Sequence, residues 1–215
     1  MRDPSLLDDI IAFGQRMLRD ELVTGTAGNI SVRTEDEMVI TPSSTPYHAI
    51  SRDDLVVLDA RGTQIGGTGQ PSAETPMHAA IYSATDAAAI VHTHSPTAVA
   101  LSCVLDELPA IHYAIARFGG DTVRVAAYER FGSDDLAATT LRALNGRRGA
   151  LLRNHGTVTY GGSLDEAYEL ALLLEWLAEV YWKARQIGEP TILSGAQLDE
   201  VVAEAKRRRY ALGST

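Results

Sequence analysis

The chain has 215 residues, 45% of them hydrophobic and 22% charged, which is the composition of a globular domain with a sizeable core. Its formal net charge of −9 argues against a broad surface for nucleic acid or an anionic membrane. The first residues lack the apolar core of a signal peptide, and no apolar run approaches the ~20 residues of a membrane span. We therefore expect a cytoplasmic protein with a single domain over residues 1–215. Cys103 stands alone, so it excludes an internal disulfide, and its apolar neighbours place it in the core.

The first part of the chain predicts two helices and three strands. Apolar residues recur at spacings of three and four after Pro4, as on the buried face of a helix. Alternating or apolar runs bounded by turn residues indicate the strands. The expected elements are a helix from residue 4 that ends before Gly25, strands at 30–33, 37–41 and 55–59, and a helix at 75–84.

Further along, strands and helices alternate. The expected elements are strands at 88–94, 122–128, 149–153 and 157–160, and helices at 96–104, at 133–144, from 163 and from 194. Several strands follow one another as hairpins, which favours a three-layer α/β/α fold with a mixed, largely antiparallel central sheet. The helix after Ser163 carries Trp176 and Trp182 and is apolar over most of its surface, so it is either buried or part of a subunit interface.

Two histidines, His92 and His94, end the apolar run of the 88–94 strand. Side chains at positions i and i+2 of a strand point to the same face, so both imidazoles can reach a single ion. For the pair alone, a second explanation stays open, in which the rings only form hydrogen bonds at the strand end.

Two other motifs favour the metal explanation. His155 ends a second apolar run, and Glu74 closes a glycine-rich loop. Three imidazoles and one carboxylate suit Zn²⁺, and they are also acceptable to Mn²⁺, Co²⁺ or Fe²⁺. We therefore expect one divalent ion, most simply Zn²⁺, with His92, His94, His155 and Glu74 as ligands.

Three loops rich in glycine and hydroxyl groups precede Glu74. They comprise residues 25–29, 42–46 and 66–72. Such loops can present backbone N–H groups and hydroxyls to an anion, although a single loop of this kind is better explained as a plain turn. Together they predict a pocket for a small anionic ligand.

Over most of its length the sequence resembles the class II aldolase/adducin family. The resemblance rests on segments that occur in the same order in this chain, at residues 25–31, 40–42, 71–74, 92–94, 110–113, 128–132 and 154–156. It implies that His92, His94 and His155 hold zinc, and that Glu74 is a ligand that leaves the ion to act as acid and base. It further implies that Tyr113 protonates the aldehyde oxygen.

The same resemblance implies a site for the phosphate group of a small sugar phosphate, at Gly28, Asn29, Ser43, Ser44, Ser72 and Ala73. It also implies that Tyr210, near the C-terminus, closes over the site. The expected reaction is reversible cleavage of a ketose 1-phosphate to dihydroxyacetone phosphate and a small aldehyde, through an ene-diolate stabilised by the metal. The expected assembly is a homotetramer in which Tyr113 enters the active site of a neighbouring chain.

Two positions depart from the aldolase pattern and leave the substrate open. Ala73 stands where the aldolases have a serine, and Ser44 where they have a glycine, so one phosphate-binding hydroxyl is lost and another is gained. A 4-epimerase of pentulose 5-phosphates and a decarboxylase or dehydratase of sugar-acid phosphates are alternatives at the same metal site. A non-catalytic adducin-type interaction module is least favoured, because all three histidines and Glu74 are present.

Overall fold

The computed structural model describes residues 4–34 and 36–208. Its helices are α1 (Pro4–Arg19), α2 (Thr75–Ala84), α3 (Pro96–Ser102), α4 (Asp134–Leu144), α5 (Leu164–Ile187) and α6 (Gly195–Arg208). Its strands are β1 (Asn29–Arg33), β2 (Glu37–Ile40), β3 (Val56–Asp59), β4 (Gln64–Gly66), β5 (Ala89–Thr93), β6 (Glu107–Leu108), β7 (Val123–Ala126), β8 (Gly149–Leu152) and β9 (Gly156–Gly161). Three short 3-10 helices, η1 (Tyr47–Ala49), η2 (Arg52–Asp54) and η3 (Tyr113–Phe118), lie in the connections.

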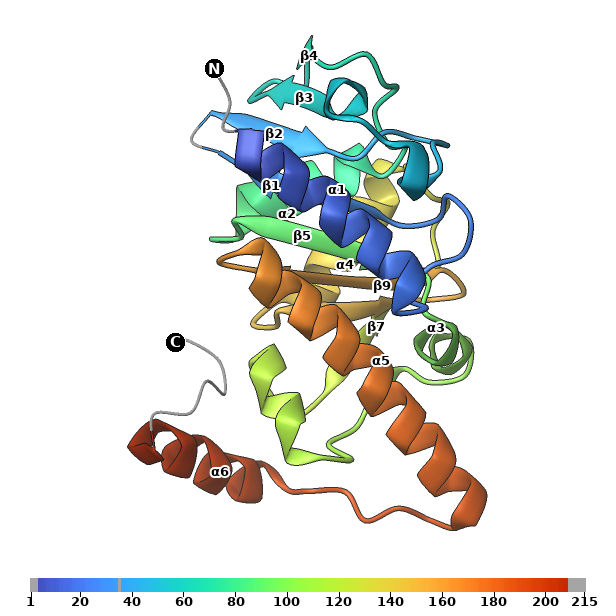
Figure 1. Ribbon diagram of the computed structural model, residues 1–215. Coiled ribbons are helices and arrows are strands. Elements are labelled where there is room, and N and C mark those ends of the chain that lie inside the picture. Colours follow the sequence, from blue (N-terminus) through green and yellow to red (C-terminus); the bar gives the residue numbers. More distant parts are fainter. Residues whose placement is uncertain (1–3, 35, 209–215) are drawn as a thin grey trace.

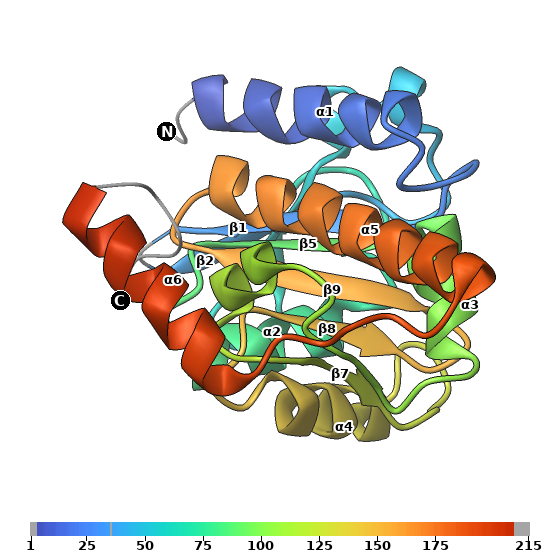
Figure 2. The same cartoon turned by 90° about the horizontal axis from the view of Figure 1, so that it is seen from below.

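The strands of the described residues form one mixed sheet in the order β4-β3-β2-β1-β5-β9-β8-β7-β6. Every neighbouring pair is antiparallel except β7 and β8, which run parallel. Helices α1 and α5 cover one face of the sheet, and α2 and α4 cover the other (Figures 1 and 2). The predicted three-layer α/β/α fold with a largely antiparallel sheet is therefore confirmed.

Buried apolar side chains fill both interfaces between the sheet and the helices. On the α1 and α5 side, Ile10 and Met17 pack with Val91 of β5. On the other side, Met77 and Ile81 of α2 pack with Ile90. Because neighbouring residues of β5 alternate between the two cores and all five residues of this strand are buried, β5 is the centre of the fold.

The structure corrects several details of the sequence prediction. Strands β4 and β6 were not expected, because β4 is an exposed edge strand and β6 has only two residues. Helix α1 ends at Arg19 instead of reaching the turn before Gly25. Cys103 is exposed and not in the core, since α3 ends one residue before it.

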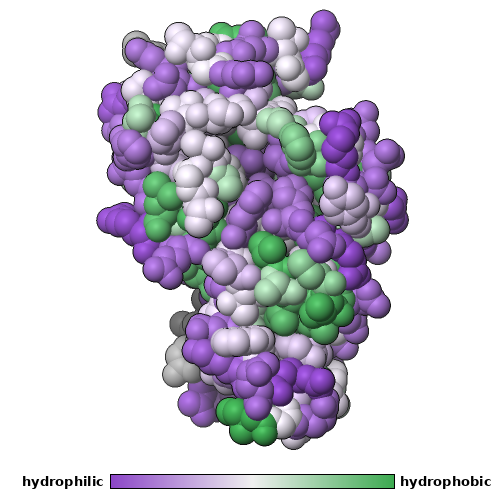
Figure 3. Space-filling model, turned by 90° about the vertical axis from the view of Figure 1, so that its right-hand side faces the viewer, coloured by the Kyte–Doolittle hydropathy of each residue, from purple (hydrophilic) through white to green (hydrophobic). Residues whose placement is uncertain are grey.

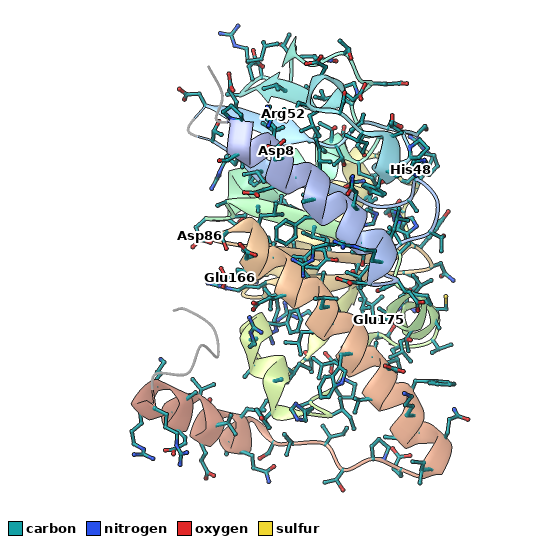
Figure 4. All side chains as sticks on the ribbon, in the orientation of Figure 1. Asp8, His48, Arg52, Asp86, Glu166 and Glu175 are labelled. Atoms are coloured by element: carbon teal, nitrogen blue, oxygen red, sulfur yellow. The ribbon has the colours of Figure 1, made fainter. Side chains whose placement is uncertain are left out.

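Two polar contacts hold distant segments together. Glu175 of α5 accepts hydrogen bonds from the backbone N–H groups of Thr97 and Ala98, at 2.9 and 2.8 Å, and so caps the start of α3 (Figure 4). Asp8 of α1 forms an ion pair with Arg52 (Figure 4). The cap is relevant to function because α3 directly follows the segment that contains His94. No helix among the described residues is long and apolar enough to cross a membrane.

The buried face of α5 provides a test of this packing. Leu174 is fully buried, whereas Ile187 at the end of the same helix is 90% exposed. We expect Leu174→Ala to lower the free energy of unfolding by roughly 2–5 kcal/mol, because it removes buried methyl groups and leaves a cavity. We expect Ile187→Ala, as the control, to change it by less than about 0.5 kcal/mol. Equal losses in chemical denaturation would contradict this description of the core.

Candidate metal centre and substrate pocket

Strand pairing brings three segments together at one end of the central strands. Asn29, the first residue of β1, lies opposite His92 near the end of β5, and His92 lies opposite Val158 of β9. The turn between β8 and β9 contains His155, whose backbone N–H donates to the carbonyl oxygen of Leu152 at 3.1 Å. Consequently His92 of β5 and His155 of the turn between β8 and β9 lie close together.

The structure brings His92, His94 and His155 together, as predicted. A ring nitrogen from each lies within 4.8 Å of those of the other two. The Nε2 atoms of His92 and His94 are 3.0 Å apart, and each pair of rings packs edge to face with centroids 4.9–5.0 Å apart. This is a cluster of three imidazoles that is consistent with a divalent metal site.

A backbone group orients the innermost of these rings. The Nδ1–H of His92 donates to the carbonyl oxygen of Thr157 at 2.8 Å, which leaves the lone pair of Nε2 directed at the other histidines. Metal-binding histidines commonly have such a contact on the second ring nitrogen.

Glu74 completes the cluster from the residue before α2. Its Oε2 lies 3.8 Å from Nε2 of His92 and 4.0 Å from Nε2 of His155. Its Oε1 accepts a hydrogen bond of 3.1 Å from the backbone N–H of Gly132. Oε2 is buried and has no hydrogen-bond partner among the described residues. A bound cation would supply the electrostatic partner that this buried carboxylate oxygen lacks.

Burial also sets the protonation states that a metal requires. It lowers the pKa of His92 well below its usual value, with further contributions from His94 and His155, and it lowers the pKa of His155 to about 4. The pKa of His94 is lowered for the same reason. Burial raises the pKa of Glu74 to about 7, an effect that the Gly132 N–H partly offsets. The three rings are therefore neutral at pH 7, as ligands must be.

The cluster lies in a pocket of about 330 Å³. The lining residues are Thr26, Gly28, Asn29, Pro42, Ser43, Ser44, Ser72, Ala73, Glu74, His92, His94, Tyr128, Glu129, Phe131, Asn154 and His155. All three loops that the sequence indicated as anion sites thus reach the same pocket as the histidines. No lysine or arginine of the described residues lines it.

Ser72 and Asn29 form a polar contact beside Glu74. The Asn29 amide donates to Oγ of Ser72 at 3.0 Å, and the Glu74 backbone N–H approaches the same oxygen at 3.3 Å. Since Oγ of Ser72 already accepts two hydrogen bonds, its own proton is available for a ligand. Ser72 also lies just before α2, whose N-terminal end favours an anion.

The other positions that the sequence predicted to bind phosphate differ in backbone conformation. Gly28 has a φ of +75°, and a Cβ at this position would lie 2.7 Å from the carbonyl oxygen of His92, so only glycine fits here. Ser44 has a φ of +57°, a conformation that glycine adopts more easily, and its Oγ lies 3.3 Å from that of Ser43. Ala73 offers no hydroxyl to the pocket.

Tyr113 does not line this pocket. It begins η3, is 46% exposed, and packs against the ring of His112, which in turn contacts Trp176. The structure therefore does not bring Tyr113 to the histidine cluster of its own chain. Tyr210, also predicted to contribute, lies outside the described residues.

Several contributors were not identified from the sequence. The carbonyl of Thr157 and the N–H of Gly132 are backbone groups, and backbone groups leave no signature in residue identity. Glu129 lies within a segment, 128–132, that the family resemblance included without a role for it. His78 is fully buried on α2, where its Nδ1 lies 2.6 Å from Oγ of Ser31.

Comparison with known proteins agrees with this geometry. Residues 8–182 match the family model described as Class II Aldolase and Adducin N-terminal domain. The chain is 39% identical to a 5-methylthioribulose-1-phosphate/5-deoxyribulose-1-phosphate aldolase of Rhodospirillum rubrum, over 85% of this chain and 82% of that protein. It is 36% identical to the L-fuculose phosphate aldolase of Escherichia coli K12, over 96% of both chains. A solved L-fuculose 1-phosphate aldolase superposes with a TM-score of 0.91 at 34% identity, covering 96% of this chain and 98% of that one.

The cluster of His92, His94, His155 and Glu74 predicts one divalent metal ion per chain. We expect protein purified without added metal to contain close to one equivalent of a divalent ion per chain by elemental analysis. Replacing both His92 and His94 by alanine removes two of the nitrogen ligands, so the content should fall to near zero. His48→Ala, at an exposed histidine on η1, is the control and should keep the metal. Unchanged metal content in the double variant would refute the assignment.

Proposed function

The chain belongs to the class II aldolase and adducin family and is a metal-dependent aldehyde-lyase. We propose that it cleaves a ketose 1-phosphate reversibly to dihydroxyacetone phosphate and a short aldehyde. The observation that carries the proposal is the position of three neutral imidazoles and a buried carboxylate in a pocket that hydroxyl-rich loops also line. A 5-deoxy-ketose 1-phosphate or L-fuculose 1-phosphate is the favoured substrate, because the relatives named above act on such compounds.

The phosphate group would be held by neutral donors. Candidates are the backbone at Gly28 and Ala73, the amide of Asn29, and the hydroxyls of Ser43, Ser44 and Ser72. Each of these residues lines the pocket. The available proton of Ser72 and the adjacent start of α2 support this assignment, since both favour an anion at this end of the pocket.

His92, His94 and His155 would hold the ion, most simply Zn²⁺, with Glu74 as a fourth ligand. The ion supplies a Lewis acid that stabilises the negative charge that carbon–carbon cleavage leaves on the ketone fragment. Glu74 would carry the proton at the carbon atom where the bond breaks. Its raised pKa of about 7 suits a group that must both accept and release a proton near neutral pH. The N–H of Gly132 holds Oε1, so the other oxygen remains directed at the histidines.

Tyr113 would exchange a proton with the aldehyde oxygen of a site on a neighbouring chain. Three observations support a shared site. Tyr113 is exposed and does not line the pocket of its own chain, and Trp176 and Trp182 of α5 are 43% and 48% exposed. Hydrophobic side chains also gather on the face shown in Figure 3, which is the right-hand side of Figure 1, where α3 lies. A homotetramer is the proposed assembly.

The reaction itself can be tested directly. Metal-loaded protein should join dihydroxyacetone phosphate to acetaldehyde or lactaldehyde, and the adduct can be followed by chromatography. Pentulose 5-phosphates serve as the comparison, because 4-epimerisation at the same ion is the alternative. Absence of any adduct while a pentulose 5-phosphate is epimerised would replace the aldolase proposal with the alternative.

Glu74 is expected to transfer the proton in addition to binding the ion. Glu74→Gln keeps an oxygen ligand but removes the titratable group, so we expect most of the metal to remain and the cleavage rate to fall by about 10²- to 10⁴-fold. Metal content and initial rates should be measured on the same preparations. If the two fall in strict proportion, Glu74 is only a ligand.

A shared site predicts complementation between chains. Tyr113→Phe and His94→Ala should each be nearly inactive alone, because one lacks the phenol and the other lacks a metal ligand. After subunit exchange, some interfaces would combine an intact metal cluster with an intact tyrosine, so activity should partly return. An active monomer in light scattering, or no recovery despite demonstrated exchange, argues against this arrangement.

A further inference from the structure

Glu129 introduces a second carboxylate into the substrate pocket. It lies on the loop between β7 and α4, is partly buried, and lines the same pocket as Glu74 and the three histidines. Its side chain has no hydrogen bond or ion pair to any of the residues that the structure describes. A carboxylate held in a pocket without a partner is available to a ligand.

The loop that carries Glu129 is anchored beside Glu74 and the histidine cluster. Gly132, three residues later, donates its N–H to Glu74 and has a φ of +71°. A Cβ on Gly132 would lie 2.7 Å from the carbonyl oxygen of Ala73, so the two segments are in close contact. The N–H and hydroxyl of Ser133 both donate to the carbonyl oxygen of Arg130, at 3.2 and 2.7 Å. Such anchoring holds this loop beside the pocket that Glu129 lines.

The charge of the pocket lining restricts what Glu129 can meet. No basic side chain of the described residues lines the pocket to neutralise it. An ionised carboxylate only accepts hydrogen bonds, and so does a phosphate dianion, so the two groups do not pair. The donors suited to the phosphate belong instead to the loops around Asn29, Ser43 and Ser72. Glu129 is therefore left to face the other half of the substrate.

We propose that Glu129 selects the aldehyde half of the substrate by charge: it repels an aldehyde that carries a carboxylate or a second phosphate, and it accepts a hydrogen bond from a neutral short aldehyde that carries a hydroxyl. This inference rests on the proposed aldolase function and narrows its substrate to neutral deoxy or hydroxy aldehydes. It also separates this chain from enzymes that act on sugar-acid phosphates, because a negatively charged acceptor half would be placed beside a like charge.

Aldol addition provides the kinetic test. Here the C3 carbon of dihydroxyacetone phosphate gives up a proton and bonds to the aldehyde carbon, and the aldehyde oxygen takes up a proton, so no atom is lost overall. Neutral glycolaldehyde and anionic glyoxylate are compared with metal-loaded wild type, Glu129→Gln and the control Asp135→Asn, which changes an exposed carboxylate in the first turn of α4. In wild type, kcat/KM should favour glycolaldehyde. Glu129→Gln should shift the ratio toward glyoxylate by about 10- to 100-fold, the size expected when a nearby like charge is removed. Asp135→Asn should leave the ratio within about twofold.

Binding without chemistry supplies a second readout. Calorimetry compares ribitol 5-phosphate with 5-phosphoribonate, in which a carboxylate replaces the terminal CH2OH two carbons beyond the three-carbon phosphate half. Glu129→Gln should tighten only 5-phosphoribonate, by about tenfold or more. Adducts in wild type together with unchanged ratios in both assays would overturn the role of Glu129 alone. Failure of wild type to form an adduct with any aldehyde would instead overturn the aldolase function, and the selection of an aldehyde half along with it.

Discussion

The antiparallel register of β5 with β1 and β9 determines where the metal-facing groups lie. It places His92 beside Asn29, the first residue of β1, and close to the start of β9, which directly follows His155. Side chains of a strand alternate between the two faces of the sheet. A slip of one position would therefore point the His92 side chain into the core beneath α1 and α5 and bring Val91 to the cluster. The packing of Ile90 and Val91 into opposite cores prevents such a slip. The hydrophobic core thereby fixes the position of the polar site.

Burial of the cluster then gives the ionisable groups the properties that the chemistry requires. The same loss of water that keeps His92, His94 and His155 neutral also raises the pKa of Glu74. In the metal-free protein this arrangement is costly, because Oε2 of Glu74 is buried without a partner among the described residues. A divalent ion would offset that cost, so burial of the cluster favours metal binding.

Much of this arrangement follows from local sequence patterns. The buried strand with histidines two residues apart, the helix at 75–84 and the alternation of strands and helices could all be predicted, because each depends on periodicity. The convergence of Glu74, His94 and His155 could be inferred only from residue chemistry and family resemblance. The very short β6, the contact of the Thr157 carbonyl and the lack of a partner for Glu129 among the described residues all depend on the tertiary structure, so no local pattern reveals them. Whether Tyr113 acts on a neighbouring chain is a property of the assembly.

The central claim is that the imidazole cluster and Glu74 form the site of metal-dependent carbon–carbon cleavage. It is tested most directly by removing the metal with a chelator and then adding Zn²⁺ in known fractions of an equivalent, while the release of dihydroxyacetone phosphate from a 5-deoxy-ketose 1-phosphate is measured. The rate should rise in proportion to added ion and level off at one equivalent per chain, and His94→Ala should stay inactive throughout. Full activity in the metal-free protein, or a rate that His94→Ala recovers with the same titration curve, would contradict the account.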